Sequence, residues 1–202
     1  MTANNLEKKF GRKTVFSNLS IETDTSVLGI AGMNGAGKST LLKCLAGLLK
    51  PTSGSVKWKW NGDEIKRTKL KNHLGFVAPY VQLYEELTVR ENLDFIKKVR
   101  SLKKINSLDE HLHFFGAEDF INLHYGELST GQQQRIKLAA AVLHEPEILL
   151  LDEPGSNLDE AGKNMVKVLV ERFSRKTQMV VIASNQQEEL ALCDEIIELT
   201  KN

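Results

Sequence analysis

Cysteine is scarce in this chain, which has only Cys44 and Cys193 among its 202 residues. Two cysteines that lie far apart in the sequence are too few for a disulfide framework or a cysteine-rich metal site. We therefore expect two buried, reduced thiols, as is usual in a cytosolic protein.

An excess of charge of one sign is also missing, because 27 Lys and Arg residues face 26 Asp and Glu residues. The formal net charge of +1 gives no reason to expect a nucleic acid as partner. The most basic stretch covers residues 97–104. We expect it to be the solvated face of a helix rather than a binding patch.

Long apolar runs are absent as well. Runs such as residues 148–151 have the length of a strand and are far too short to span a membrane. Residues 1–5 are polar and do not resemble the start of a secretory signal. We therefore expect a cytoplasmic protein whose membrane contact, if it has one, comes only through a partner.

The chain contains no internal repeat and no low-complexity linker, so its length suits a single domain over residues 1–202. Its first zone, to about residue 75, mixes strands with a helix and includes an edge strand at 58–62 that turns at Asn-Gly. The middle, from about 84 to 125, has a helical pattern. Strands and helices then alternate again, with strands at 148–151 and 179–183 and a helix at 161–173. This order predicts an α/β fold with a mostly parallel sheet flanked by helices, an N-terminal β-rich edge and a helical subdomain inserted at about 84–130.

The strongest motif is the glycine-rich segment 32–40, GMNGAGKST. The apolar run 27–31 before it predicts a buried strand, and the helix-prone run 41–46 follows it, with Gly47 as the expected stop. This strand–loop–helix setting distinguishes a phosphate-binding loop (P-loop) from a structural glycine turn.

A P-loop binds polyphosphates because its backbone N–H groups point inward and the helix that follows adds partial positive charge. Lys38 is expected to reach the β- and γ-phosphates, and the Ser39 hydroxyl to ligate Mg²⁺. The other loop residues expected around the nucleotide are Asn34, Gly35, Ala36, Gly37 and Thr40. The sequence therefore predicts ATP and Mg²⁺ as cofactors.

Two adjacent carboxylates follow the strand predicted at 148–151. Ligands of open α/β sheets collect at the carboxyl ends of the strands, so Asp152 and Glu153 should lie near the phosphates. Asp152 suits the Mg²⁺ shell, and Glu153 suits the polarisation of the water that attacks the γ-phosphorus. The alternative is a surface pair of acidic residues at a strand end.

Residues 128–135 read LSTGQQQR. Ser129 followed by Gln132 also forms a capping box, which is sufficient to start a helix. The order of the motifs adds more, because the P-loop, the Leu-Ser-x-Gly-Gln motif, the Asp-Glu strand and residues 156–159 (SNLD) follow one another as in ABC-type ATPases. The chain resembles these nucleotide-binding subunits of ABC transporters over nearly its whole length.

The resemblance implies that two such subunits, identical or different, pair head to tail around two ATP molecules. Ser129 and Gly131 would then contact the γ-phosphate held by the opposite P-loop, with Gln132 beside them, and Asp159 would lie at the dimer seam. Phe10 matches the aromatic residue that stacks on adenine, although it also suits a core position.

Three positions depart from the family pattern. Thr130 stands where glycine is commonest, a mild change. Pro79 occupies the place of the glutamine that links Mg²⁺ to the membrane partner, and Gln82 either replaces that glutamine as a metal ligand or faces solvent. Asn185 ends the segment 179–185, which resembles the family's last core strand, and the family usually has a histidine there that contacts the γ-phosphate.

Asn185 can donate a hydrogen bond, but it cannot become cationic or carry a proton. The loss of one preorganised contact to developing charge typically costs ~3 kcal/mol, and an amide that keeps part of the contact should cost less. We therefore expect Lys38, Glu153 and Asn185 to support hydrolysis that is slow rather than absent.

The resemblance implies the ATP-hydrolysing motor subunit of a membrane transporter whose permease is a separate chain. The segment 83–93 is most similar to compact exporter-type subunits such as the haem-exporter ATPases of cytochrome c maturation. Two alternatives remain open: a soluble ABC ATPase outside transport, and an ATP-gated dimer clamp with little turnover.

Overall fold

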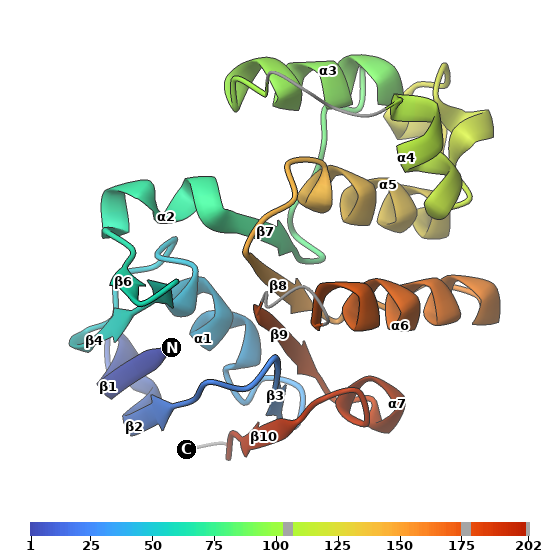
Figure 1. Cartoon of the computed structure of the whole chain (residues 1–202). Coiled ribbons are helices and arrows are strands. Elements are labelled where there is room, and N and C mark those ends of the chain that lie inside the picture. The colour runs from blue at the N-terminus through green and yellow to red at the C-terminus, as the bar shows by residue number, and fades with distance from the viewer. Residues whose placement is uncertain (103–106, 175–178, 201–202) are drawn as a thin grey trace.

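The computed structural model describes residues 1–102, 107–174 and 179–200. Its centre is a five-stranded, fully parallel sheet in the order β10-β3-β9-β8-β7 (Figure 1). The strands are β3 (Val27–Ala31), β7 (Leu74–Val77), β8 (Ile148–Asp152), β9 (Met179–Ser184) and β10 (Glu195–Glu198). The predicted α/β class with a mostly parallel sheet is confirmed.

Alternate residues of the central strands point to opposite faces of the sheet, as the period of a strand requires. On β8, Leu149 and Leu151 join one hydrophobic cluster, whereas Ile148 and Leu150 join the other. Both faces of the sheet are therefore buried, which explains why its strands are apolar at consecutive positions.

The first of these clusters packs the sheet against α5 (Thr130–Val142) and α6 (Glu160–Ser174). The second packs it against α1 (Lys38–Leu45), α2 (Arg67–His73) and the N-terminal strands. Figure 1 shows α5 and α6 beside the upper strands and α1 on the opposite side. The short helix α7 (Gln187–Leu190) leads from β9 towards β10.

The N-terminal strands form a separate antiparallel sheet in the order β2-β1-β4, from β1 (Thr2–Phe10), β2 (Lys13–Glu22) and β4 (Ser53–Lys57). The turn expected at Asn-Gly joins β5 (Lys59–Trp60) to β6 (Asp63–Glu64). Asn61 and Gly62 have φ angles of 51° and 88°, as a tight hairpin turn of this kind requires.

The helical region between β7 and α5 contains α3 (Val89–Val99), α4 (Leu108–Phe114) and the 3₁₀ turns η1 (Glu118–Phe120) and η2 (Tyr125–Glu127). Thr88 caps α3 in a capping box with Glu91. Figure 1 shows α3 and α4 above α5, on the side away from the N-terminal sheet.

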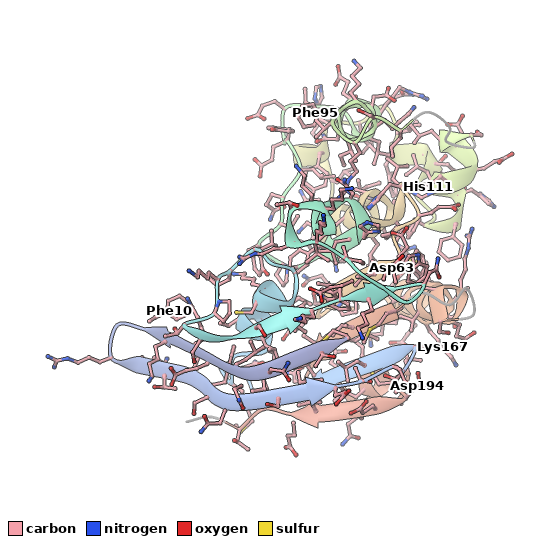
Figure 2. All side chains as sticks on the ribbon, turned by 60° about the vertical axis from the view of Figure 1, so that its left-hand side comes forward. Phe10, Asp63, Phe95, His111, Lys167 and Asp194 are labelled. Atoms are coloured by element: carbon pink, nitrogen blue, oxygen red, sulfur yellow. The ribbon has the colours of Figure 1, made fainter. Side chains whose placement is uncertain are left out.

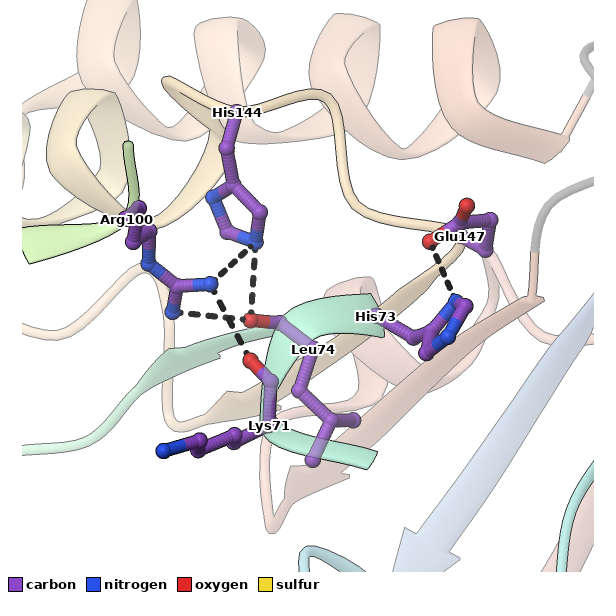
Figure 3. A network of polar contacts seen from close by, with 6 residues as sticks. All are labelled: Lys71, His73, Leu74, Arg100, His144 and Glu147. Atoms are coloured by element: carbon purple, nitrogen blue, oxygen red, sulfur yellow. Dashed lines mark hydrogen bonds and ion pairs between the residues drawn. The ribbon is translucent and has the colours of Figure 1, made fainter. Parts of the chain in front are cut away.

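Lys98 and Arg100 of the basic stretch at 97–104 are exposed, as expected for a solvated face, but Arg100 also makes polar contacts (Figure 3). Arg100 follows α3, and its guanidinium donates to the carbonyls of Lys71 at 3.0 Å and Leu74 at 3.2 Å. It also lies 2.8 Å from Nε2 of His144, which is itself 3.0 Å from the Leu74 carbonyl. Arg100 therefore ties the helical region to the start of β7. Residues 103 and 104 lie outside the described residues.

The two thiols do not share one environment. Cys44 is buried on α1, as expected, whereas Cys193 is partly exposed, so the expectation of a buried thiol is wrong there. Both are free thiols. Burial raises the pKa of each thiol, that of Cys193 to about 11, so neither is an activated nucleophile.

Candidate functional site

The P-loop joins β3 to α1, as the sequence predicts. Gly37 has a φ of 106° and precedes the helix, and a Cβ at this position would lie 2.5 Å from Cγ1 of Val15. Glycine is therefore required by both conformation and space. Gly47, with a φ of 71°, follows α1 and ends it.

The loop encloses its own lysine. Lys38 is only 5% exposed, and its Nζ donates to the carbonyl of Gly32 at 2.8 Å and to that of Met33 at 3.4 Å. This arrangement holds a positive charge within the loop, which suits the binding of a polyphosphate.

A pocket of about 440 Å³ opens over the loop. Residues from three parts of the chain line it: the P-loop, Glu153 at the end of β8, and the hairpin that joins β1 to β2. The lining residues are Phe10, Lys13, Thr14, Val15, Asn34, Gly35, Ala36, Gly37, Lys38, Ser39, Thr40 and Glu153. The volume suits a nucleotide-sized ligand.

Phe10 stands at the mouth of this pocket and is 53% exposed, which excludes the alternative of a core position. Nζ of Lys8 lies 4.8 Å from the centre of its ring. The sequence did not predict that Lys13, Thr14 and Val15 line the pocket. Only the pairing of Phe10 with Lys13 and of Lys9 with Thr14 across the hairpin brings them to the pocket.

Asp152 is buried beside the P-loop and is 1% exposed. Burial raises the pKa of its carboxyl group, while hydrogen bonding from the Ser39 hydroxyl and the charge of Lys38 oppose the shift. Among the residues that the structure describes, Oδ2 of Asp152 has no hydrogen-bond partner. A buried carboxylate oxygen beside a hydroxyl offers a divalent cation two oxygen ligands.

Glu153 turns out of the strand with a φ of 49°, and its N–H donates to the carbonyl of Ala183 on β9 at 2.8 Å. Asn185 follows β9, and its Nδ2 donates to Oδ1 of Asn34 in the P-loop at 3.0 Å. The carboxyl ends of β8 and β9 thus place Glu153 and Asn185 at the same edge of the sheet as the P-loop.

The structure does not bring Gln82 to the pocket lining. Oε1 of Gln82 accepts a hydrogen bond from the hydroxyl of Tyr125 at 3.3 Å, on the side of the helical region. Tyr80, two residues earlier, packs its ring under Nζ of Lys43 at 3.6 Å. Gln82 therefore contacts the helical region, and nothing in the described residues places it on a metal.

Ser129, Gly131, Gln132 and Asp159 also lie outside the pocket of their own chain. Ser129 is exposed and caps α5 in a capping box with Gln132, as predicted. A Cβ at Gly131 would lie 2.8 Å from the carbonyl oxygen of Asn157, so α5 starts in close contact with the loop after β8. Asp159 accepts from Arg135 at 2.8 Å and has a side chain that is 71% exposed.

Comparison with known proteins identifies the family. Residues 17–156 match the sequence profile of the ABC transporter family. The chain is 31% identical over 198 residues to an uncharacterized ABC transporter ATP-binding protein of Bacillus subtilis, covering 96% of this chain and 90% of that one. It is 36% identical over 200 residues to a probable sulfate/thiosulfate import ATP-binding protein of Chlorella vulgaris, covering 96% and 84%.

Solved structures show the same fold. A bacterial ABC transporter cassette in dimeric form superposes with a TM-score of 0.83 at 25% identity, covering 98% of this chain and 93% of that one. A dimeric cassette in a post-hydrolysis state, bound to ADP and Pi, superposes with a TM-score of 0.80 at 26% identity, covering 98% and 94%. By sequence and by structure, the chain belongs to the ABC transporter family and is an ATP-binding ABC ATPase.

Proposed function

We propose that two copies of this chain, or one copy and a related ATPase, close head to tail on two ATP molecules and power a separate membrane permease. The observation that carries this proposal is the separation of the motifs. Phe10, the P-loop and Glu153 share one pocket, whereas Ser129 is exposed outside it. A second chain would bring Ser129 and Gly131 to the open side of that pocket and Asp159 to the seam.

Each pocket residue has a chemical role in this proposal. Phe10 stacks on adenine, while Lys38 and the N–H groups of the P-loop hold the β- and γ-phosphates. Glu153 orients the attacking water and accepts its proton as the new bond to the γ-phosphorus forms. The bond between the γ-phosphorus and the β–γ bridging oxygen breaks, and ADP leaves with that oxygen. Asn185 donates one hydrogen bond to the γ-phosphate.

Mg²⁺ fits the oxygens present in this site. Ser39 and Asp152 would hold it, with Oδ2 of Asp152 as the buried oxygen that lacks a protein partner among the described residues. Mg²⁺ commonly binds one or two carboxylates together with substrate phosphates and waters, and it neutralises charge on the β- and γ-oxygens when bound. The sequence hypothesis that Gln82 is a further ligand would require its side chain to leave Tyr125.

The permease would dock on the helical region. Phe95 on α3 and Tyr84 before it pack edge to face, with ring centres 5.3 Å apart, yet remain 43% and 54% exposed. Figure 2 shows Phe95 at the top of the molecule, away from the hairpin that carries Phe10. Exposed aromatic side chains that pack together are typical of protein interfaces.

In the part of the chain that the structure describes, no helix is long and apolar enough to cross a membrane. We propose that the protein forms one ABC-type domain over residues 1–202, with a helical subdomain at about 84–130. It lies on the cytoplasmic face of the membrane through its permease, and no nucleic acid takes part.

The experiment is Glu153→Gln, with Glu160→Gln as the control. Glutamine keeps the shape of Glu153 but cannot accept the proton, so hydrolysis should fall by about a hundredfold or more. ATP should still bind, and an ATP-dependent dimer should appear on a sizing column. Glu160 is exposed and paired with Lys163, so its variant should behave like the parent. A Glu153→Gln protein that hydrolyses ATP at the parental rate would contradict the role of Glu153.

A further inference from the structure

A buried glutamate on α7 contacts the loop that follows β8. Glu189, on α7, is 7% exposed, and its Oε1 accepts a hydrogen bond from the backbone N–H of Gly155 at 2.7 Å. Its other oxygen, Oε2, has no hydrogen-bond partner among the described residues. Burial raises the pKa of this carboxyl group, and hydrogen bonding from the Ser184 hydroxyl and the Gly155 N–H opposes the shift.

Stability alone does not account for a carboxylate at this position. The neighbouring cation, Lys163, is paired with Glu160 at 2.9 Å. A buried carboxylate that lacks an ion pair costs folding free energy. The contact is also tight, because a Cβ at Gly155 would lie 2.6 Å from Oε1 of Glu189. The fold therefore places a glycine directly against a buried acid whose burial costs folding free energy.

The loop after β8 also contacts α5. The carbonyl of Pro154 accepts a hydrogen bond from the buried side chain of Gln134 at 2.9 Å. Three residues further on, the carbonyl of Asn157 lies against Gly131. The N-terminal end of α5, which carries Ser129, therefore packs against this loop. A shift of Gly155 would move the loop and with it this packing surface.

The loop after β9 joins this strand to α7, which carries Glu189, and it contacts the P-loop. Ser184, the buried last residue of β9, precedes Asn185, and its hydroxyl accepts a hydrogen bond from the N–H of Gln186 at 3.0 Å. Asn185 in turn donates to Asn34 at 3.0 Å. Asn34 thus contacts Asn185, the chain continues from Asn185 through Gln186 into α7, and Glu189 on α7 contacts Gly155.

We propose that Glu189 is a positioning residue that couples the occupancy of the P-loop to the position of the loop after β8, and through it to Ser129 and Gly131. This inference rests on the proposed function and deepens it. The nucleotide held by one chain would set the surface that the same chain offers to the nucleotide of its partner. Such coupling requires an element linked to both sites, and Glu189 contacts the loop after β8 and belongs to α7, which directly follows the loop after β9.

The test is hydrogen exchange of the dilute, monomeric protein with and without the slowly hydrolysed analogue ATPγS. In the parent, nucleotide should slow exchange in peptides covering 32–40 and also in those covering 153–159. In Glu189→Ala, the protection of 32–40 should remain, while that of 153–159 should fall by about tenfold, within the range of allosteric couplings. Glu189→Gln keeps an acceptor for the Gly155 N–H and should restore the coupling. Glu188→Ala, a change at an exposed neighbour, is the control.

Equal protection of 153–159 in the parent and in Glu189→Ala would overturn the inference. A parent in which nucleotide does not protect 32–40 would instead overturn nucleotide binding at the P-loop, so the two failures are distinguishable. A double-mutant cycle with Gly155→Ala gives an independent measurement. Alone, Gly155→Ala should uncouple the loops by displacing Glu189, but it should add nothing in the Glu189→Ala background, where the space is free. Additive effects would also overturn the inference.

Discussion

The P-loop pocket and the signature segment at 128–135 differ in construction, although we propose that both belong to nucleotide sites. The pocket is concave and encloses Lys38, which is 5% exposed. The signature segment begins a helix with Ser129 exposed to solvent. In the proposed function, the pocket binds the polyphosphate within one chain, whereas the signature segment contacts a nucleotide that another chain presents. The difference separates substitutions that abolish binding from those that abolish only assembly and turnover.

Lys38→Ala should have the largest effect, because it breaks the pocket itself. The cation that faces the β- and γ-phosphates is lost, so ATP binding should fall below detection or leave an inert complex. Binding of a fluorescent ATP analogue and phosphate release measure the two effects. Lys57→Ala removes an exposed charge paired with Glu64 and should leave both unchanged. Parental affinity and turnover in Lys38→Ala would refute the P-loop assignment.

Ser129→Asp should break the signature segment while sparing the pocket. Aspartate caps helices as well as serine does, so the start of α5 should persist. Its charge, however, would repel the triphosphate of a partner chain. We expect parental ATP binding by the single chain, no ATP-dependent dimer, and hydrolysis reduced by about a hundredfold.

Ser129→Ala provides the comparison for that variant. It removes the hydrogen bond that Ser129 accepts from the N–H of Gln132 at 3.3 Å, at a cost of about 1 kcal/mol in stability. It introduces no repulsion, so its dimer should weaken rather than vanish. If Ser129→Asp dimerises as the parent does, the signature segment does not face a bound nucleotide.

Asn185→Ala should have a smaller effect, because the amide contributes one contact at the edge of the pocket. Hydrolysis should slow by less than about a hundredfold, while ADP, which lacks the γ-phosphate, should bind as before. The rates should be compared in the presence of the membrane permease. Equal ATPase rates for the parent and the variant would show that Asn185 takes no part.

The smallest effect concerns neither site but the joint between the helical region and the sheet. Burial and the charge of Arg100 lower the pKa of His144 to about 4. The unfolded chain therefore binds a proton that the folded chain does not, between about pH 6.5 and about pH 4, and stability is lost as the pH falls through this window.

His144→Gln cannot titrate and should flatten this part of the pH dependence, which urea unfolding at a series of pH values measures. Lys98→Gln, at an exposed side chain of α3, should keep the parental slope. A His144→Gln protein that loses stability as steeply as the parent over this range would show that His144 is not the responsible group.

Local chemistry explains what could be predicted in advance. The glycine pattern of 32–40, the capping box of Ser129 and the Asn-Gly turn act over a few residues, so each is readable without knowledge of the fold. The sheet also follows from its apolar strands, because strands that alternate with helices must be parallel and covered on both faces. The helix α2 was missed, since its lysine-rich sequence buries only Leu70 and carries little apolar pattern.

The sequence by itself thus determined the P-loop, the acidic pair after β8 and the parallel sheet, because each depends on neighbours along the chain. Tertiary structure alone decided that Lys13 and Val15 line the pocket, that Gln82 meets Tyr125, and that Glu189 meets Gly155. These contacts join residues from separate elements, and their existence depends on how the strands, helices and turns pack together. No local pattern carries that information, since the partner of a buried polar group is set by the whole fold around it.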